Sequence, residues 1–405
     1  MSITGYNENC KDTVEEFWDK EILERCIEMS ERVDVEDFLM RLKTFLGVSG
    51  TIRAAPSCRV ALEAALAGTF RLARTRGDAV LICSFNCPAV CHAATRAGLS
   101  VETFDLADIS GRIDWEAVST RLTHRHHAVV VPHLFGVPSD FRPVQEAAAK
   151  LGVIVIEDCA HTLGGKIGSA VAGSVGDIAV FSFNYDKPIS MGGGGALLVN
   201  NHELKAACHP PQVCPSKECE IKELGQFTAF IEDRRGNIRR KGLMARAANR
   251  VLGRRKIAHK MVEPCGFGSV RAALGIWNLD HYPRIVEHRN RNAAAFSDIS
   301  QWRAWNVARS VEPAWLKQKI MPLYPADVLT ISQRLRDRGL RVGCFNWPET
   351  VDQELLLPAQ PNADFVAHNG LDSPLHQRIG TEDINLIREV LEHTWLATAR
   401  IAGLL

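Results

Sequence analysis

Five short apolar runs constrain the fold of this chain more than any other feature of its sequence. Each run is continuous instead of alternating with polar residues, which is typical of a strand that is covered on both faces. The runs are Ala79–Cys83, Ala128–Pro132, Val153–Ile156, Ile178–Phe181 and Ala196–Val199. Stretches with helical composition separate several of them, at Val60–Arg76, Pro88–Gly98 and Phe141–Leu151. This alternation predicts an α/β domain built on a mainly parallel sheet.

The chain has 405 residues, enough for two domains with sizeable cores. We expect a helical N-terminal arm at 1–44, a large domain at 45–285 with a basic excursion at about 208–262, and a smaller α+β domain at 286–405. The arm is expected because Val14–Arg32 contains few helix breakers. In the last part we expect strands at Ile320–Leu323 and Arg341–Cys344, and helices at Ala326–Arg338 and Glu382–Thr398.

The charge balance gives no indication of a nucleic-acid or membrane partner. The 48 basic and 47 acidic side chains nearly cancel. No window approaches the roughly 18 consecutive apolar residues that a membrane-spanning helix needs. The first residues have neither the basic nor the apolar segment of a signal peptide, so we expect a cytoplasmic protein.

Twelve cysteines are spread along the chain. In a cytoplasmic protein we expect them to be reduced and mostly buried. Two groups are closely spaced, but neither has the short C-x-x-C spacing of a zinc site, so no metal site is predicted. The groups are Cys83, Cys87 and Cys91, and Cys208, Cys214 and Cys219.

Two runs near the middle of the chain carry the residues with the clearest chemical meaning. Asp158 follows the apolar run that ends at Ile156, and Lys187 lies shortly after the run that ends at Phe181. A lysine amine can form a Schiff base with the aldehyde of pyridoxal phosphate (PLP), and an aspartate can keep the ring nitrogen of PLP protonated. Because ligands of parallel sheets bind at the carboxyl ends of the strands, this placement predicts a PLP site.

An ordered set of motifs surrounds these two residues. Glu157-Asp158-Cys159-Ala160-His161 comes first, then Gly173–Asp177, then Phe181-Ser182-Phe183 with Lys187 five residues after the serine, and last the glycines Gly192–Gly195. In this order, from about Thr51 to about Leu391, the chain resembles the DegT/StrS-type sugar aminotransferases. These are PLP-dependent enzymes of fold type I, in the aspartate aminotransferase superfamily.

The resemblance implies a role for several residues. Lys187 corresponds to the lysine that binds PLP and shuttles protons, and Asp158 to the partner of the pyridinium nitrogen. His161 corresponds to the residue beside the phenolic oxygen of PLP, and Ser182 to a hydroxyl that binds the PLP phosphate. Ser57, Cys58 and Arg59 align with the helix start that binds the same phosphate, a position where free N–H groups and the helix dipole favour an anion.

The chain also departs from the family pattern. Cys58-Arg59 stands where the family has Gly-Thr or Gly-Ser, and Gly193 stands where it has an acid. Cys87 takes the place of an aromatic residue that stacks on PLP, so that contact is either lost or made by Phe85. The family element that reaches the neighbouring active site is replaced by Pro264-Cys265-Gly266-Phe267.

The resemblance implies transfer of an amino group from glutamate or glutamine to a keto-sugar, nucleotide-linked, or to a related cyclic ketone. Such reactions serve polysaccharide or secondary-metabolite biosynthesis. It also implies a homodimer, because the active sites of the family are shared between subunits. Two alternatives are a PLP-dependent sugar dehydratase, whose relatives carry histidine in place of Lys187, and a scaffold protein that kept the fold without catalysis.

A basic segment at 234–260 contains many lysines and arginines and no acid. Its apolar residues recur at helical spacing, so 239–256 is expected to form a basic amphipathic helix. Such a helix could bind an anionic substrate such as a nucleotide-diphosphate sugar, dock on an acidic membrane surface, or simply pack with its charged face in solvent.

Overall fold

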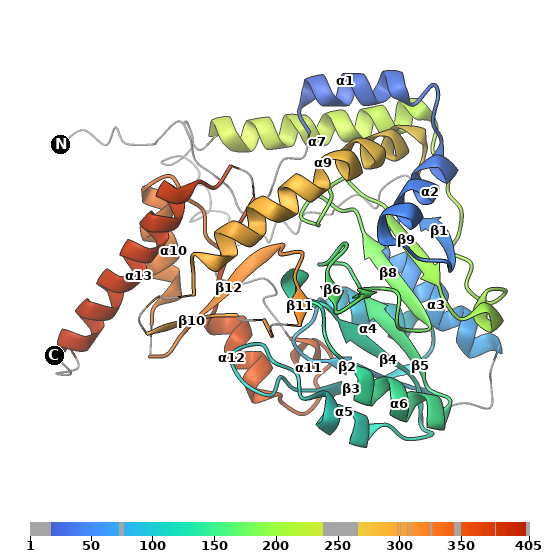
Figure 1. The fold of residues 1–405 in the computed structure, drawn as a ribbon, viewed down its shortest axis with the longest axis horizontal. Helices are drawn as coiled ribbons and strands as arrows, with labels where there is room; N and C mark the ends of the chain where they lie inside the picture. Colours follow the sequence, from blue (N-terminus) through green and yellow to red (C-terminus); the bar gives the residue numbers. More distant parts are fainter. Residues whose placement is uncertain are drawn as a thin grey trace, which may run out of the picture.

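The largest sheet in the described part of the chain has seven strands, which lie between residues 51 and 199 (Figure 1). The computed structural model describes residues 18–401, except for 73–76, 238–265, 344–349 and the single positions 298, 300, 306, 309, 325 and 377. The strand order is β1-β9-β8-β5-β4-β2-β3. The strands are β1 Thr51–Ala55, β2 Ala79–Cys83, β3 Ser100–Phe104, β4 His126–Pro132, β5 Ile154–Asp158, β8 Ile178–Ser182 and β9 Gly195–Val199.

The sheet is mainly parallel, as predicted. Strands β3, β2, β4, β5 and β8 run in the same direction, whereas β9 is antiparallel to both of its neighbours. All five apolar runs of the sequence form strands of this sheet. The sequence analysis missed the two edge strands, β1 and β3, because polar residues interrupt both of them.

Alternate residues of the central strands belong to different hydrophobic clusters. In β4, Val129 and Val131 face the cluster that includes α5 and α6, whereas Ala128 and Val130 face the cluster that includes α3 and α4. Both faces of the sheet are therefore covered, which explains why the strands are apolar throughout. The covering helices are α3 Cys58–Leu72, α4 Pro88–Arg96, α5 Trp115–Arg121 and α6 Arg142–Leu151.

The C-terminal part contains a small antiparallel sheet of order β10-β12-β13 with helices around it. The predicted strand at 341–344 was wrong: in its described part, Gly343 forms only an isolated bridge with Asp372. The strands are β10 Trp302–Ala304, β12 Lys317–Pro322 and β13 Leu371–Pro374. The helices are α10 Val328–Asp337, α11 Val351–Glu354, α12 Pro361–Asn369 and α13 Thr381–Ile401.

One long helix, α9 (Ser269–Ala294), connects the two sheets and is continuous through residue 285, where the sequence analysis placed a domain boundary. That boundary stays a prediction. Helices α1 (Lys20–Met29), α2 (Val35–Leu46) and α7 (Lys217–Asn237) pack against α9, and in Figure 1 α1 and α7 lie alongside it. Buried Glu220 of α7 accepts hydrogen bonds from Gly268 N and Val270 N, so α7 is fixed to the start of α9.

Three short strands form a separate ribbon of order β11-β6-β7, in which β11 (Val311–Glu312) joins β6 (Lys166–Ile167) and β7 (Ala170–Val171). Two 3₁₀ turns complete the elements, η1 (Leu134–Gly136) and η2 (His202–Leu204). The basic helix predicted at 239–256 lies outside the described residues. Within the described part of the chain, each helix is too short or too polar to cross a bilayer.

Candidate active site

The predicted site residues meet at the carboxyl edge of the large sheet. Asp158 is the last residue of β5 and Ser182 is the last residue of β8. Because these two strands are parallel neighbours, their ends lie at the same edge. Lys187 lies in the connection that leads from β8 to β9, which continues through the glycines at 192–195. The sheet topology therefore brings the acid and the lysine to one place.

Lys187 is largely buried and carries its charge beside an acid. Its Nζ lies 3.7 Å from Oδ1 of Asp186, and its side chain is only 14% exposed. Burial alone would lower the pKa of Lys187, but the charges of Asp186 and Asp158, with the nearby thiols of Cys87 and Cys58, outweigh burial and raise it. Without a cofactor, the lysine is thus held in its protonated form.

Asp158 is a buried carboxyl without enough positive charge around it. Its Oδ1 accepts a hydrogen bond from Ala160 N at 3.0 Å. Burial raises the pKa of Asp158, and the hydrogen bond from Ala160 N and the charge of Lys187 offset only part of this effect. A buried acid of this kind is stabilised by a further cationic partner. The position therefore suits a protonated ring nitrogen.

His161 forms part of the wall beside Lys187. Its ring stacks on Phe135, with centroids 5.5 Å apart, and its Nδ1 accepts a hydrogen bond from Phe135 N at 3.4 Å. Burial, followed by the charges of Lys187 and Lys317, holds the pKa of His161 well below the ordinary value. His161 is therefore neutral, with its proton on Nε2, where it can donate a hydrogen bond.

The start of α3 lies directly against the glycine run. Ser57 forms a parallel bridge with Gly194, and Ser57 Oγ accepts a hydrogen bond from Val60 N at 3.3 Å. A Cβ on Gly195 would lie 2.5 Å from the backbone nitrogen of Cys58, so only glycine fits there. The first N–H groups of α3, a 15-residue helix, therefore lie at the sheet edge that carries Asp158 and Lys187.

The predicted phosphate ligands differ in how closely the structure ties them to Lys187. Cys58 lies near enough to Asp158 and Lys187 that their charges affect the pKa of its thiol, which burial raises. Ser182 shares the strand edge and Arg59 the helix start, and both are at least partly buried.

Phe85 and Cys87, the two residues considered for ring stacking, lie in different surroundings. Phe85 is fully buried between Phe135 and Trp305, with Lys319 over its ring, and so belongs to the core between the two sheets. Burial raises the pKa of the Cys87 thiol, and Cys87 lies near enough to Lys187 that the charge of the lysine partly opposes this rise. Of the two residues, the Cys87 thiol is therefore the one that lies near Lys187, whereas Phe85 packs in the core between the two sheets.

Of the residues that replace the family's inter-subunit element, Gly266 and Phe267 are described. Gly266 has φ of 136°, and a Cβ there would lie 2.1 Å from the carbonyl oxygen of Val213. Phe267 packs against Phe38 and lies where a Cβ on Gly194 would meet its ring at 2.7 Å. This segment therefore supports the glycine run from within the same chain.

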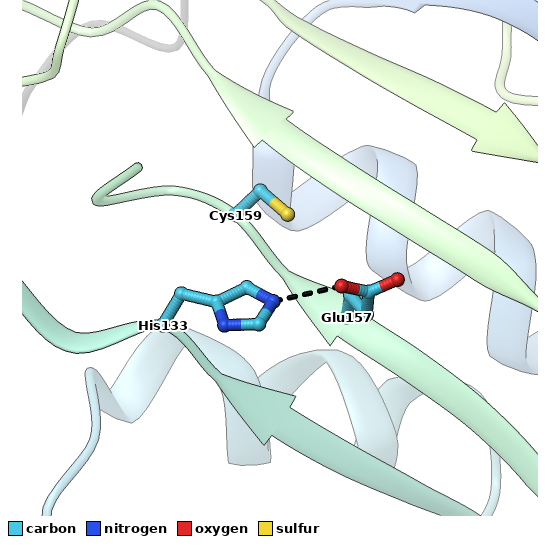
Figure 2. Close-up of side chains that lie close together, drawn as sticks. All are labelled: His133, Glu157 and Cys159. Carbon is cyan, nitrogen blue, oxygen red and sulfur yellow. Dashed lines mark hydrogen bonds and ion pairs between the residues drawn. The ribbon is translucent and has the colours of Figure 1, made fainter. Parts of the chain in front are cut away.

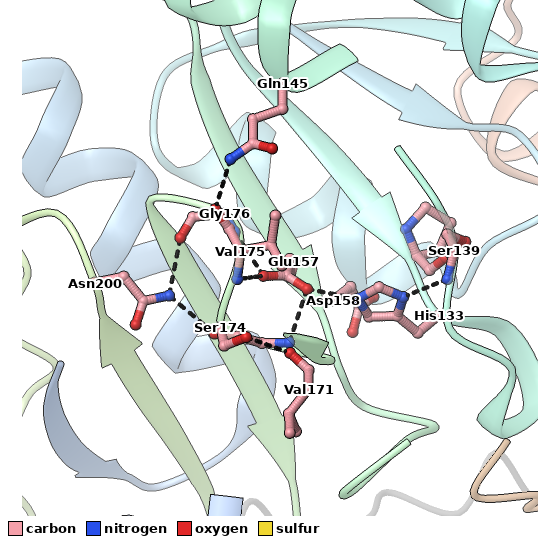
Figure 3. A network of polar contacts seen from close by, with 12 residues as sticks. His133, Ser139, Gln145, Glu157, Asp158, Val171, Ser174, Val175, Gly176 and Asn200 are labelled. Carbon is pink, nitrogen blue, oxygen red and sulfur yellow. Dashed lines mark hydrogen bonds and ion pairs between the residues drawn. The ribbon is translucent and has the colours of Figure 1, made fainter. Parts of the chain in front are cut away.

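The sequence analysis missed a buried network around Glu157. Its carboxylate accepts hydrogen bonds from Gly173 N, Val175 N and Gly176 N at 2.6–2.8 Å, and from His133 Nε2 at 2.8 Å (Figures 2 and 3). His133 Nδ1 accepts from Ser139 N, so the ring proton lies on Nε2. His133 N also donates to the carbonyl of Asp158 at 3.1 Å. The network therefore fixes the backbone that carries Asp158.

This network includes the one group of residues, within the described ranges, whose atoms have metal-ligand spacing: His133, Glu157 and Cys159 (Figure 2). Both carboxylate oxygens of Glu157 already accept N–H donors, and His133 Nε2 carries a proton. Burial raises the pKa of the Cys159 thiol far above its ordinary value, which disfavours the thiolate that binds metals. The group is best explained as a hydrogen-bonded support.

Replacing Glu157 by glutamine should lower the free energy of unfolding at pH 7 by about 3 kcal/mol or more, because buried N–H donors and His133 lose a charged acceptor. The net effect of its partners is to lower the pKa of Glu157 below 4.5, although burial opposes them. Its stabilisation is therefore complete above pH 4.5 and lost as pH falls through the lower folded pKa.

Urea unfolding at pH 7 and at pH 3.5 would measure both effects. The difference between wild type and Glu157→Gln should shrink at the lower pH. Glu24→Gln is a matched control, since the Glu24 side chain is 63% exposed, and it should change stability by a few tenths of a kcal/mol. An equal effect of the two substitutions at pH 7 would contradict the structural role of Glu157.

Comparison with known proteins agrees with this geometry. The family model described as the DegT/DnrJ/EryC1/StrS aminotransferase family matches residues 21–392. A pleiotropic regulatory protein of Geobacillus stearothermophilus is 27% identical over 196 residues, which are 46% of this chain and 51% of that protein.

A UDP-N-acetyl-3-dehydro-alpha-D-glucosamine 3-aminotransferase of Acidithiobacillus ferrooxidans is 30% identical over 38% of this chain and 41% of the relative. An L-glutamine:2-deoxy-scyllo-inosose aminotransferase of Streptoalloteichus tenebrarius is 30% identical over 50% of this chain and 48% of the relative. The chain thus spans about half the length of the curated relatives it matches.

Solved structures match over nearly the whole chain. DesI, solved with its TDP-sugar product, superimposes with a TM-score of 0.71 at 20% identity and covers 98% of this chain and 97% of its own. Spr1654 from Streptococcus pneumoniae, described as a sugar aminotransferase and solved in its PLP form, has a TM-score of 0.69 at 17% identity, with 95% and 98% covered. These likenesses establish the fold predicted from the sequence.

Proposed function

The chain belongs to the DegT/DnrJ/EryC1/StrS aminotransferase family, and we propose that it transfers an amino group from glutamate or glutamine to a keto-sugar. The acceptor is a nucleotide-linked keto-sugar or a related cyclic ketone. The relatives' names include both an aminotransferase for a UDP-linked sugar and one for a cyclitol ketone with glutamine as donor. One observation carries the proposal: largely buried Lys187 and buried Asp158 lie at the carboxyl edge of a parallel sheet, close enough for each charge to affect the pKa of the other.

The site fits PLP on the observations of this structure. Asp158 is a buried acid whose raised pKa reflects a shortage of positive charge. The start of α3 offers N–H groups at the same edge, next to a glycine that leaves no room for a Cβ. In the proposed arrangement Lys187 would bind the aldehyde carbon of the cofactor and Asp158 would pair with its ring nitrogen. Ser182 and the helix start at Ser57, Cys58 and Arg59 would bind its phosphate.

Bound PLP supplies an aldehyde that takes up the amino group and a protonated ring that withdraws electrons from the reacting carbon. Lys187 provides the amine that holds the cofactor. Once the substrate amine has displaced it, its Nζ can carry a proton from the α-carbon of the amino acid to the carbon that Lys187 had occupied. Asp158, ionised by pairing, keeps the ring nitrogen protonated. The family resemblance implies that neutral His161 would lie beside the phenolic oxygen of the cofactor. A homodimer is part of the proposal and rests on the family resemblance.

The proposal is tested in two half-reactions with ¹⁵N-labelled glutamate and purified protein loaded with PLP. We expect 2-oxoglutarate in an amount equal to the enzyme before any ketone is added. The label should then appear in an amino sugar, detected by mass spectrometry, after a nucleotide-linked keto-sugar is supplied. Loss of a sugar hydroxyl without gain of nitrogen would instead support a dehydratase. No reaction of either kind with folded, PLP-loaded protein would contradict catalysis.

A further inference from the structure

Lys317, the first residue of β12, is a second lysine beside the site. Strand β12 is the central strand of the small sheet. Residues two apart in a strand point to the same face. Lys319 places its Nζ 5.6 Å from the ring centroid of Phe85 and 5.8 Å from that of Phe135, both in the large domain. Lys317 therefore points from the small sheet toward the large domain as well.

Two backbone contacts place the start of β12 next to the wall of the site. Leu316 N donates to the carbonyl of Phe135 at 2.8 Å, and Ala314 N donates to that of Gly136 at 2.9 Å. Phe135 is the residue whose ring stacks on His161. Lys317 thus follows directly after a residue that is bonded to the support of His161.

A buried arginine links the two lysine-bearing segments. Nη1 of Arg289 contacts the carbonyl of Pro188 at 3.4 Å and that of Trp315 at 3.5 Å. Pro188 follows Lys187, and Trp315 lies two residues before Lys317. Because Arg289 is almost fully buried, these segments are held in a fixed relation to each other.

The charges at the site agree with this placement. Lys317, with Lys187, helps to lower the pKa of Asp186 against the opposing effect of burial, and the same two lysines help to lower that of His161. Among the residues that the structure describes, no carboxylate lies within ion-pair distance of Lys317, whereas Lys319 is paired with Asp372 at 3.0 Å. Lys317 is also only partly buried, so its ammonium group can meet a ligand.

An anionic group of a substrate suits such a cation. In an amino acid, the α-carboxylate is attached to the carbon that bears the amine, so it must lie close to Lys187 during the reaction. In a nucleotide-linked sugar, the phosphate is attached to a different carbon from the ketone, so it need not lie there. Since Lys317 adjoins both the lysine segment and His161, the amino acid is the better match.

We propose that Lys317 binds the α-carboxylate of the amino donor and so selects an α-amino acid for the first half-reaction. This inference rests on the proposed function. It gives the small sheet a direct part in substrate choice, because Lys317, the cation that would bind the donor, belongs to β12. Arg289 holds the backbone just before Lys317 in position.

The test compares L-glutamate with 4-aminobutanoate, which has the same skeleton without the α-carboxylate. In PLP-loaded protein, Lys317→Gln should lower kcat/KM for glutamate roughly 10- to 100-fold, the value of one charge-assisted contact. The same substitution should leave kcat/KM for 4-aminobutanoate unchanged. Lys317→Arg should restore most of the preference for glutamate over 4-aminobutanoate. Calorimetry with glutarate, an unreactive dicarboxylate, should show a similar loss of affinity without any turnover.

The controls separate this inference from the proposed function. Lys166→Gln removes an exposed lysine and should change kcat/KM for neither glutamate nor 4-aminobutanoate. The Lys317 variants should keep the wild-type melting temperature and cofactor absorbance. Wild-type transfer with no loss of donor preference in Lys317→Gln would overturn the inference alone. The inference would also be overturned if Lys317→Gln bound the nucleotide-linked keto-sugar more weakly but kept the wild-type donor preference, because Lys317 would then bind a phosphate. A wild-type protein that does not react with PLP would overturn both.

Discussion

Replacing Lys187 by alanine should abolish covalent attachment of PLP and lower the rate of amino transfer by roughly 10⁴-fold or more, because the nucleophilic amine and the proton carrier are lost together. The wild-type protein should show an absorbance band near the visible edge that changes when glutamate is added. The variant should show neither the band nor the change. Borohydride reduction followed by mass spectrometry should place the cofactor on the peptide that contains Lys187 in wild type alone.

Lys187→Arg separates charge from nucleophilicity. It keeps a cation beside Asp186 and Asp158 but offers no amine to the cofactor, so it should be as inactive as the alanine variant while folding normally. Exposed Lys166, changed to alanine, serves as the control and should leave the band intact. A wild-type band that persists in Lys187→Ala would show that another amine holds the cofactor and would contradict the assignment.

Replacing Asp158 by asparagine should slow the first half-reaction by roughly 10²- to 10³-fold, the cost of removing one partner from a buried ion pair. Lys187 remains, so the cofactor should still attach. The charge of Asp158 helps to raise the pKa of Lys187, so the pH at which the amine loses its proton in the cofactor-free protein should fall. Stopped-flow absorbance and competitive labelling of Lys187 across pH would measure the two effects.

Stability distinguishes this role from a purely structural one. Burial raises the pKa of Asp158 in the fold, so without a cofactor the ionised acid costs stability at pH values above its ordinary pKa of 3.8. Asp158→Asn should therefore stabilise the cofactor-free protein at pH 7 and reduce the further stabilisation gained on adding PLP. If the substitution instead weakened the cofactor-free fold, Asp158 would be a structural residue.

The positions of residues that are set by the local sequence could be predicted well. An apolar run covered on both faces specifies a buried strand, and the strand ends fix where Asp158 and Ser182 lie. Lys187 follows within a few residues, so its place at the same edge needs no knowledge of distant contacts. The edge strands β1 and β3 were missed because they mix polar and apolar residues, and only their last two residues are fully buried in the assembled sheet.

Other features were decided by tertiary structure. Phe85 was a candidate for ring stacking until packing placed it in the core with Trp305. The support of Asp158 by Glu157 and His133 depends on a loop at 173–176 that returns to the end of β5. The one signal for Lys317 was the polar run Lys317-Gln318-Lys319 before apolar residues in a strand, which does not identify what the lysine faces.

By itself, the sequence determined the parallel sheet, the order of its motifs and the lysine and aspartate at its edge, because strand burial and strand ends are set by neighbouring residues. Only the tertiary structure brought the start of α3 against Gly195 and carried Lys317 of the small sheet to the same site. These contacts join segments far apart in the chain, and their formation depends on how helices and sheets pack, which no local pattern encodes.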